Sequence, residues 1–408
     1  MIEALARCSA GLDVHKATVV CTVLSEDCDG RIHKETREYP TFRQNLEQLA
    51  KWLRDVEVEV AAMESTGVYW RAVYEALEEV EIRVFVVNAR HIKNVPGRKT
   101  DVQDSEWLAE LARCGLLRPS FIPPQDFRQL RLLTRYRSKL SGSLSGEKNR
   151  LHKVLDDCGI RLGCVVSDID GVSARRMIEA LIENQMTPEE MAELALGRLR
   201  KKESEIRMAL DGRISDRHRF VLRCIQSHIK WLDRQIEGND RQVVAAMKPY
   251  QQEWQLIQTI PGFNEISAAM LLIEIGVDMS RFGNKDRLSS WAGMCPGNNQ
   301  SAGKKKWSDR YKGDRYVKQI LCEVSNSAIK TESQFKGFYK GIVIRRGHKR
   351  AIIAVGHKLL EIVYIVLSKK KPYKDPEIDY EALTVQRNAP RWIQALEKFG
   401  YLEVGNFR

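Results

Sequence analysis

The chain has 408 residues, of which 66 are Lys or Arg and 54 are Asp or Glu, so its formal charge is +12. A chain of this length can form two or three domains with sizeable cores. Its excess of positive charge favours a polyanionic partner, either nucleic acid or an acidic membrane surface. Residues 281–370 hold 20 Lys and Arg against 6 Asp and Glu, a net of +14. The positive surface is therefore expected mainly in the C-terminal part.

The nine cysteines are scattered, without a C-x-x-C pair or a Cys/His ligand spacing, which argues against a zinc site and a disulfide framework. Free thiols suit a reducing cytoplasm. Met1–Ala10 lacks the basic and apolar regions of a signal peptide. The apolar stretch Ala351–Leu367 is interrupted by His357, Lys358 and Glu361, so we expect a buried helix there and no membrane span. These features predict a cytoplasmic protein.

The early part of the chain alternates between strand and helix patterns. Gly11–Leu24 is rich in β-branched residues and is expected to form a strand. Asp13 lies inside this run, where a buried carboxylate needs a partner such as a metal ion. The plain alternative is that Asp13 ends a loop before the strand. Further strands are expected over Ile32–Tyr39, Val58–Met63 and Ile82–Val87, and helices over Thr41–Val56, capped by Thr41 and packed through Phe42, and over Tyr69–Leu77. This alternation predicts an α/β layer with a sheet covered on both faces.

Three further carboxylates follow these elements. Glu64 comes directly after its strand, where α/β sheets bind ligands, although an ordinary helix start also explains it. Asp101 and Asp104 lie three residues apart on one face of a helix expected over Asp101–Cys114. Two carboxylates that close raise each other's pKa unless a cation lies between them. Together with Asp13 they form a set that can hold two Mg²⁺ ions for a phosphoryl transfer.

The middle of the chain has the pattern of long helices. After Pro123-Pro124, heptad spacing runs from Leu130 to Val154, and residues 222–236 follow the 4-3 alternation of a coiled-coil seam. The two seams are expected to pack on each other, either within one chain or between chains. Between them, Cys158–Gly212 is expected to be helical and polar, with a helix start at Thr187-Pro188.

Two turns mark the C-terminal part. Ile260–Phe263 is either a helix-hairpin-helix turn, whose amides contact a phosphate, or a plain turn between helices. Arg287–Gly303 is rich in Pro, Gly and Asn, which predicts a loop. Ser301 lies in it, just before Lys304-Lys305-Lys306. A serine beside such a lysine run can attack a phosphodiester held by those charges, although most loop serines only bond the backbone.

Several segments resemble a known family. GLDVHKATV, MESTGVYW and NARHIKNVPGRKTDVQDSEWLAEL resemble the N-terminal domain of the DEDD transposases of the insertion-sequence one-ten family. WAGMCPGNNQSAGKKK, KGDRYVKQILCEVSNSAIK and RRGHKRAIIAVGHKLLEIVY resemble that family's C-terminal transposase domain. The resemblance implies that the metal-binding, catalytic carboxylates are Asp13, Glu64, Asp101 and Asp104. It also implies that Ser301 is the nucleophile, with Ser289, Ser290 and Ser308 as lesser candidates.

The expected fold class is α/β plus α. The expected domains are a ribonuclease H-like (RuvC-like) DEDD domain over residues 1–124, a helical coiled-coil region over 125–250, a mostly helical transposase domain over 251–380 and a tail over 381–408. The resemblance implies a DNA transposase-recombinase that forms a phosphoserine link with DNA. It further implies donor and target DNA, a guide (bridge) RNA and a homo-oligomer, either a dimer or a tetramer, in a bacterial cytoplasm near the nucleoid.

The nucleic-acid-binding residues are expected to be Lys304, Lys305, Lys306, Arg345 and Arg346. Two other enzyme classes remain open. One is a metal-dependent hydrolytic junction resolvase that uses the same carboxylates with water as the nucleophile. The other is a kinase of the actin-like fold, which GLDVHKATV also resembles, although His15-Lys16 stand where its phosphate loop needs glycine. A non-catalytic nucleic-acid-binding protein gives no reason for the clustered acids.

Overall fold

The computed structural model of the chain describes residues 5–65, 67–88, 101–184, 186–295, 300–301, 304–305, 313–376 and 380–401. Within these ranges the side chains of residues 101–103, 300–301, 304–305, 380–381 and 384 are not described. The chain divides into two compact units, Met1–Ile122 and Pro123–Arg408, and each is described by itself. The finer division expected at residues 250 and 380 stays a prediction.

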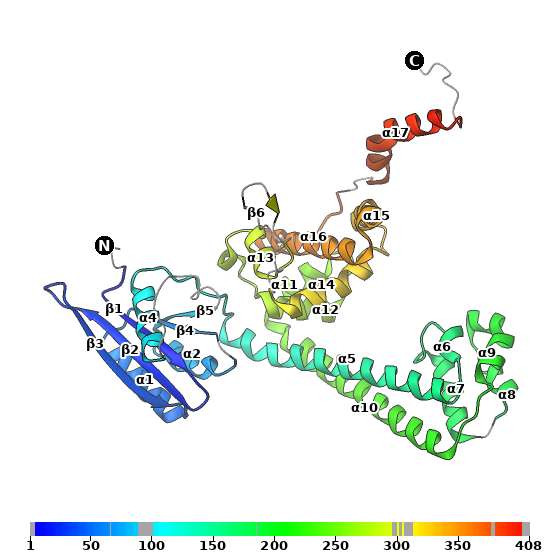
Figure 1. Ribbon diagram of the computed structural model, residues 1–408, viewed down its shortest axis with the longest axis horizontal. Helices are drawn as coiled ribbons and strands as arrows, with labels where there is room; N and C mark the ends of the chain where they lie inside the picture. The colour runs from blue at the N-terminus through cyan, green and yellow to red at the C-terminus, as the bar shows by residue number, and fades with distance from the viewer. Residues whose placement is uncertain are drawn as a thin grey trace. The chain divides into compact units, whose positions relative to one another are not determined.

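The first unit is built on a five-stranded mixed sheet with the strand order β3-β2-β1-β4-β5 (Figure 1). The strands are β1 (Cys8–Val14), β2 (Thr18–Glu26), β3 (Ile32–Pro40), β4 (Val60–Glu64) and β5 (Arg83–Val87). β1, β2 and β3 are antiparallel neighbours, whereas β4 pairs in parallel with β1 and with β5. The sheet therefore has an antiparallel half and a parallel half, and β1 lies at its centre.

The single strand expected over Gly11–Leu24 is wrong, because this run folds as the β1–β2 hairpin. The exposed residues between the strands form the turn, in which the His15 amide donates to the Thr18 carbonyl at 2.9 Å. The polar His15-Lys16 pair breaks the β-branched pattern, and polar residues of this kind favour a turn. Asp13 consequently lies inside β1, so the alternative that it ends a loop is also wrong.

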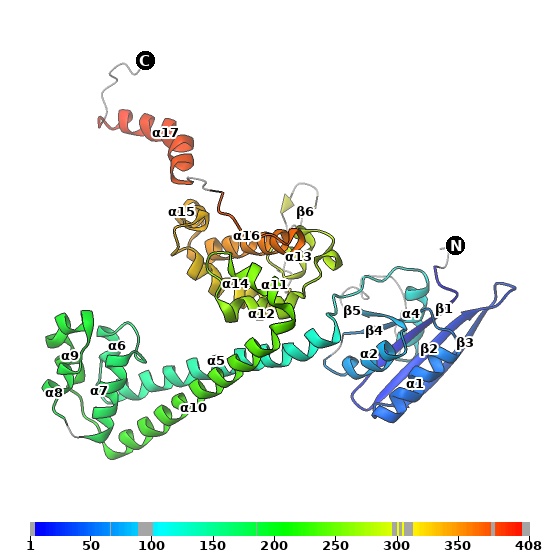
Figure 2. The ribbon, with the colours of Figure 1, turned by 180° about the vertical axis from the view of Figure 1, so that it is seen from behind.

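Helices cover both faces of the sheet, as the sequence predicts. α1 (Arg43–Asp55) and α2 (Trp70–Glu79) pack on one face, where Leu12, Leu49 and Met63 are buried in a common core. α4 (Asp101–Arg113) packs on the other face, over Ala62 and Val87 (Figures 1 and 2). Side chains alternate between the two faces along each strand, so the two cores lie on opposite sides of β1 and β4.

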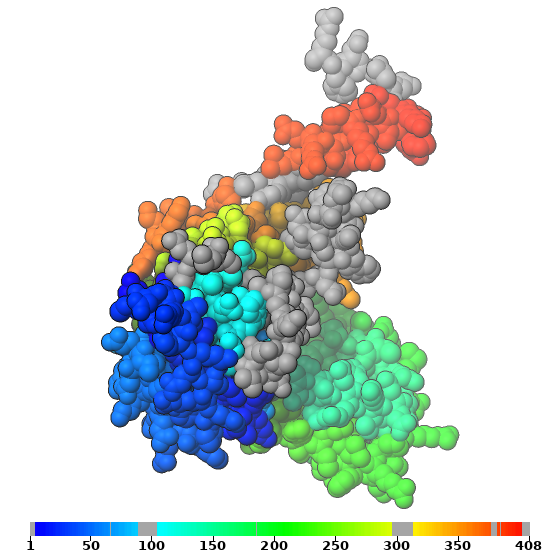
Figure 3. Space-filling model, turned by 60° about the vertical axis from the view of Figure 1, so that its left-hand side comes forward, coloured from blue at the N-terminus to red at the C-terminus, as the bar shows by residue number. Residues whose placement is uncertain are grey.

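The expected start of α1 is wrong in two respects. Phe42, not Thr41, is the N-cap, and its side chain is 76% exposed. The Thr41 hydroxyl instead donates to the Lys16 carbonyl at 2.8 Å, which ties the end of β3 to the hairpin turn. Most residues of the edge strand β3 are exposed at the surface of this unit (Figure 3). The Thr41 side chain is therefore directed to the hairpin turn, and the helix begins one residue later than expected.

The second unit begins with α5 (Gln125–Asp157), which packs along α10 (Asp216–Ala246) (Figures 1 and 2). Leu151 of α5 and Leu222, Ile225 and Ile229 of α10 are buried in one cluster, so the two predicted seams pack within one chain. The polar seam positions are paired. Arg137 Nη2 donates to Asp240 at 3.1 Å, and buried Glu147 contacts His228 at 2.9 Å and Arg150.

The segment between the two long helices is helical, but the expectation that it is polar is wrong. Its elements are α6 (Leu162–Val165), α7 (Val172–Glu183), α8 (Pro188–Glu193), η1 (Gly197–Lys202) and α9 (Glu203–Leu210). They enclose a core with Leu162, Met177 and Ile206, which are fully buried. α7 supplies the largest share of this core, and the frequent charged residues between the apolar ones hide the core in the sequence. Thr187 and Glu190 form the capping box that starts α8.

The rest of the second unit is a group of helices. They are η2 (Lys248–Tyr250), α11 (Gln251–Gln258), α12 (Glu265–Ile275), η3 (Met279–Phe282), α13 (Lys285–Trp291), α14 (Arg315–Ala328), α15 (Gln334–Arg346), α16 (His348–Lys369) and α17 (Tyr380–Lys398), with two short strands, β6 (Gln300–Ser301) and β7 (Lys304–Lys305). Among the described residues, α16 alone is long and apolar enough to cross a membrane by length and composition. It instead packs against α11, α13, α14 and α15, which bury Val355, Leu359 and Val363.

The turn at Ile260–Phe263 joins α11 to α12 and packs against α14. Gly262 has a φ of +94°, and a Cβ there would lie 2.6 Å from the Val324 carbonyl oxygen and 2.8 Å from Ala328. Glycine is therefore needed for close helix packing as well as for the turn. The structure shows a turn between helices here, and the phosphate contact of a helix-hairpin-helix turn stays a prediction.

The in-chain seam leads to a prediction about stability. Ile225→Asp combined with Leu232→Asp places two charges in an apolar contact within one protomer. This should lower the free energy of unfolding by about 5 kcal/mol. We expect the midpoint temperature of thermal unfolding, measured by circular dichroism, to fall by a large amount. Val221→Asp, on the same helix but 42% exposed, is the control and should change the midpoint little. Dissociation of an oligomer into protomers of unchanged thermal stability would contradict this expectation.

Candidate active site

Two of the predicted carboxylates lie side by side at the centre of the sheet. β1 and β4 are parallel, and Leu12 pairs with Met63 in their register. The next residue on each strand is Asp13 or Glu64, so both carboxylates stand at the carboxyl ends of neighbouring strands. Because Leu12 and Met63 belong to the α1–α2 core, the alternation of side chains directs Asp13 and Glu64 towards the α4 face.

Gly11 lets α4 lie directly on β1. A Cβ at Gly11 would be 1.9 Å from the Ser105 carbonyl oxygen and 2.4 Å from the Ala109 amide nitrogen. Two residues earlier on the strand, the Ser9 hydroxyl donates to the Ala109 carbonyl at 3.0 Å. Strand and helix therefore run in opposite directions, and two strand residues match about one helical turn. Two residues further along the strand from Gly11 is Asp13. One turn earlier on the helix is the first turn of α4, so the two are expected to lie opposite each other.

A buried hydroxyl pair fixes this end of α4 to the sheet. Thr22 of β2, the register partner of Gly11, contacts the Ser105 hydroxyl at 2.8 Å and the Thr36 hydroxyl at 3.0 Å. Sequence reasoning did not single out Ser9, Thr22 or Ser105. The signal was the period-two series of small or polar residues at positions 9, 11 and 13, which marks the strand face on which the helix packs.

Asp13 also has a neighbour that the sequence analysis did not include in the site. His15 Nε2 lies 3.0 Å from Asp13 Oδ2. The Asp13 side chain is 20% exposed, whereas that of His15 is 58% exposed. His15 is the first residue of the turn after β1, and this contact places its exposed imidazole to orient the carboxylate from the solvent side.

The donor chemistry of this edge fits a divalent cation, because Mg²⁺ and Ca²⁺ prefer carboxylate oxygens. Asp104 lies on the sheet-facing side of α4. It comes one residue before buried Ser105 and one helical turn before buried Leu108. The side chain of Asp101 is not described. Among the side chains that are described, no three His, Cys, Asp or Glu residues gather into a metal-binding group. The fold thus brings Asp13 and Glu64 together and directs the start of α4 towards them.

Ser301 lies in the second unit. The predicted loop over Arg287–Gly303 is wrong in its first part, because α13 continues to Trp291. Ser301 itself belongs to β6 and is the backbone register partner of Lys304 in β7. This short hairpin places the first lysine of the run directly across from the serine. The side chains of Ser301, Lys304 and Lys305 are not described, and Lys306 lies outside the described residues.

Two glycines join the ends of the segment that carries Ser301. Gly293 and Gly313 have φ values of +68° and +51°. A Cβ on Gly313 would lie 2.4 Å from the Ala292 carbonyl oxygen and from the Gly293 amide nitrogen, and one on Gly293 would lie 2.9 Å from the Gly313 Cα. We call this contact the glycine clasp. It requires two residues without side chains, both in the left-handed region.

A buried ion-pair network holds the residue that follows the clasp. Asp314 caps α14 by accepting from the amides of Tyr316 at 2.8 Å and Val317 at 3.0 Å. Arg135 of α5 reaches Asp314 at 3.7 Å and binds both carboxylate oxygens of Glu274 at 2.9 Å. Glu274 of α12 is 1% exposed, and a buried carboxylate needs such partners. The network joins α5, α12 and the start of α14.

The alternative nucleophiles near this segment differ in access. Ser289 is fully buried, and its Oγ has no hydrogen-bond partner among the described residues. Ser290 is exposed, and Ser308 lies outside the described residues. Burial, with help from Asp286 and Glu361, raises the pKa of the Cys295 thiol, so this thiol is protonated at neutral pH. All nine cysteines are free.

The predicted nucleic-acid-binding residues Arg345 and Arg346 are exposed at the end of α15. The next residues, Gly347-His348-Lys349-Arg350, are exposed as well and begin α16. Six consecutive surface positions therefore carry four guanidinium or ammonium groups and one imidazole. Such a run is the electrostatic footprint of a polyanion-binding surface.

Comparisons with known proteins identify the family. A DEDD model of the IS110 group, described as "Transposase", matches residues 10–160, and a second model, described as "Transposase IS116/IS110/IS902 family", matches residues 254–340. The two matches together cover more than half of the chain. The chain belongs to the IS110 family of DEDD transposases. It is by class a DNA transposase or recombinase, as the sequence predicts.

Relatives of this IS110-family chain carry matching descriptions. The transposase for insertion sequence element IS1111A of Coxiella burnetii is 22% identical over 344 residues, which cover 82% of this chain and 84% of the relative. The pilin gene-inverting protein of Moraxella bovis is 31% identical over 124 residues, 29% of this chain and 38% of that protein.

The RuvC structure of Thermus thermophilus is 15% identical, with a TM-score of 0.22, and its match covers 28% of this IS110-family chain and 99% of RuvC. A structure of the same protein in complex with a Holliday junction gives the same values. A TM-score of this size does not establish a common fold. The description of the first unit therefore rests on its own strand order.

The close approach of α4 predicts the effect of one methyl group. Gly11→Ala should push α4 away from β1 and destabilise the first unit by about 3 kcal/mol, the upper part of the usual range for overpacking. DNA cleavage should fall with it, because the start of α4 moves away from Asp13. Chemical denaturation measures the first effect, and a strand-cleavage assay measures the second.

The control is Gly142→Ala in α5, an exposed helical position with no atom within 4 Å of the added Cβ. This change should stabilise its helix by about 1 kcal/mol and leave cleavage intact. Unchanged stability and cleavage in the Gly11 variant would contradict the contact between α4 and β1.

Proposed function

We propose that this IS110-family transposase cuts and rejoins DNA with two sets of groups. Asp13, Glu64, Asp101 and Asp104 of the first unit form the metal-binding set, and Ser301 of the second unit is the nucleophile. The observation that carries the first part is the placement of Asp13 and Glu64 next to each other on parallel strands, facing the helix that begins with the other two carboxylates.

In this proposal the four carboxylates would hold two Mg²⁺ ions, which when bound stabilise negative charge on the oxygens of a phosphodiester. His15 orients Asp13, and the buried Thr22–Ser105 contact keeps the start of α4 in place. The proposed ribonuclease H-like fold agrees with the observed strand order and with the position of β1 at the junction of the antiparallel and parallel halves.

The Ser301 hydroxyl attacks the DNA phosphorus, so that an Oγ–P bond forms as the bond to one deoxyribose oxygen breaks. The serine proton leaves to a carboxylate or water, and the displaced oxygen takes up a proton. The hydroxyl of a second strand then attacks the phosphoserine and releases Ser301. Lys304, Lys305 and Lys306 hold the phosphate during these steps, because ammonium groups beside the hairpin balance its charge.

The proposed partners are donor and target DNA, a guide RNA and further copies of the chain. Support for nucleic acid comes from the net charge of +14 over residues 281–370 and from the exposed run that includes Arg345 and Arg346. The guide RNA and the dimer or tetramer rest on the family resemblance. Sequencing the RNA that co-purifies with the protein tests the first, and light scattering with and without DNA tests the second.

One observation favours a second candidate, a hydrolytic resolvase or endonuclease with water as the nucleophile. The carboxylates and Ser301 belong to different compact units. A water molecule needs no approach between units, whereas attack by Ser301 requires its hairpin to reach a set of carboxylates on the same or another protomer. The nature of the reaction product separates the two mechanisms.

Removal of one carboxylate should stop catalysis without loss of binding. Asp13→Asn should lower the rate of strand cleavage by about 100-fold or more, since the cation site loses a ligand, while DNA affinity stays nearly the same. Asp29→Asn, an exposed carboxylate in the β2–β3 turn, is the control and should retain activity. Full cleavage by the unchanged protein in excess chelator would exclude the carboxylate mechanism.

Ser301→Ala should keep folding and DNA binding, yet abolish both cleavage and strand exchange. Stopped reactions of the unchanged protein should contain DNA attached to the peptide that bears Ser301, identified by mass spectrometry. Attachment to Ser290 or Ser308 would assign the nucleophile to another residue and preserve the covalent mechanism. Normal cleavage by the alanine variant, with a free phosphate end, would show that water is the nucleophile.

A further inference from the structure

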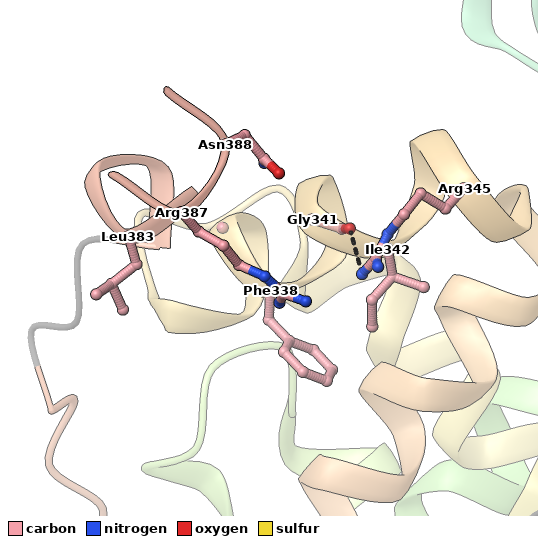
Figure 4. Close-up of a pocket in the computed structure, with 8 residues that line it drawn as sticks. Phe338, Gly341, Ile342, Arg345, Leu383, Arg387 and Asn388 are labelled. Carbon is pink, nitrogen blue, oxygen red and sulfur yellow. Dashed lines mark hydrogen bonds between the residues drawn. The ribbon is translucent and has the colours of Figure 1, made fainter. Parts of the chain in front are cut away.

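A groove lies between α15 and α17, at the C-terminal limit of the segment that the second family model matches. Its volume is about 340 Å³, at the lower end of the roughly 300–1,000 Å³ range of small-ligand sites. Phe338, Ile342 and Leu383 give it an apolar lining, and Arg345 and Arg387 contribute guanidinium groups from the two helices (Figure 4). The groove thus combines apolar and cationic surface, and its volume matches that of one small ligand.

The charges of the groove are unbalanced. No Asp or Glu is among its lining residues. In the part of the chain that the structure describes, neither Arg345 nor Arg387 has a carboxylate partner, and Arg345 makes only a 3.4 Å hydrogen bond to the Gly341 carbonyl. Arginines without acids to pair with are suited to a phosphate group.

The apolar surface narrows the choice of ligand. A duplex presents phosphates, but its bases are stacked and paired, so it has no flat apolar group to place against Phe338 and Leu383. An unpaired nucleotide offers both a phosphate and a free base. Leu383 is 52% exposed, which is unfavourable in water and is relieved when a base covers it.

We propose that the groove between α15 and α17 binds one unpaired nucleotide of a nucleic-acid strand. The base lies on Phe338, Ile342 and Leu383, and the phosphate lies between Arg345 and Arg387. This inference rests on the proposed function only in that nucleic acid is the partner of this chain. It assigns a role to α17, and it joins the exposed basic run at Arg345 and Arg346 to a defined site.

The experiment compares affinities of the full chain for a short fluorescent single strand, DNA or RNA, and for the corresponding duplex, without divalent cation. Arg387→Gln should weaken single-strand binding and reduce the slope of log K against log salt by about 0.7, the value for one phosphate contact on a single strand. Leu383→Glu, which places a carboxylate in the groove at an exposed position, should weaken it about tenfold. Duplex binding should stay unchanged in both variants.

Arg391→Gln is the matched control, because Arg391 is exposed one turn later on α17 and does not line the groove. It should leave single-strand affinity intact. Equal losses in the Arg387 and Arg391 variants, equal losses for duplex and single strand, or no loss at all would each overturn the proposal. A loss seen with DNA, with RNA or with both supports it and identifies the strand. Since no cleavage is measured, failure of the Ser301 mechanism would not alter these affinities.

Discussion

The contact between Gly11 and α4 is the constraint on which the candidate site depends. Because no side chain stands at position 11, the helix backbone rests on the strand, and the Ser9 and Thr22 hydroxyls bond to it there. Because α4 lies this close to β1, its first turn begins near the carboxyl ends of β1 and β4. Asp13 and Glu64 lie at this edge of the sheet, next to each other on parallel strands, although about fifty residues separate them in the sequence.

The second unit uses a different kind of constraint, since its key contacts are ionic and buried. Glu274 is buried among the helices, where Arg131 and Arg135 of α5 both bind it. Breaking one side of such a group leaves an uncompensated charge and typically costs about 3–5 kcal/mol. The same Arg135 reaches the cap of α14. The long helix that forms the coiled-coil seam is thereby connected to the end of the segment that carries Ser301.

Much of the fold could be predicted from local patterns, and the failures have physical causes. The strand over Ile32–Tyr39 was predicted correctly, and the heptad spacing in α5 and α10 made their helical type predictable. The β1–β2 hairpin was missed because only two polar residues interrupt a run of β-branched ones. The core around Met177 and Ile206 was missed because frequent charged residues separate its apolar ones, although α7 carries an apolar stripe from Ala174 to Ile182. The role of Thr41 depends on Lys16, a contact across the sheet that no local rule contains.

The carboxylates of the candidate site could be proposed from residue type and family pattern. The residues that support them could not. Asp13 and Glu64 could be found because a carboxylate in or after a buried strand is unusual. His15, Thr22 and Ser105 are ordinary residues whose importance comes only from what lies opposite them. The groove between α15 and α17 was also beyond reach, because Phe338 and Arg387 are separated by the whole of α16 and meet only in the folded chain.

The glycine clasp has a consequence for how this chain can change over evolution or by design. Because Gly293 and Gly313 touch through their backbones, the two ends of the intervening segment are fixed a few ångströms apart by the helices on either side. A segment anchored in this way behaves as a cassette, since loop-closure entropy varies only slowly with length. Changes of length within it should leave the helical framework folded as long as Met294 is kept, because this residue follows Gly293 and is buried against Gly356 of α16.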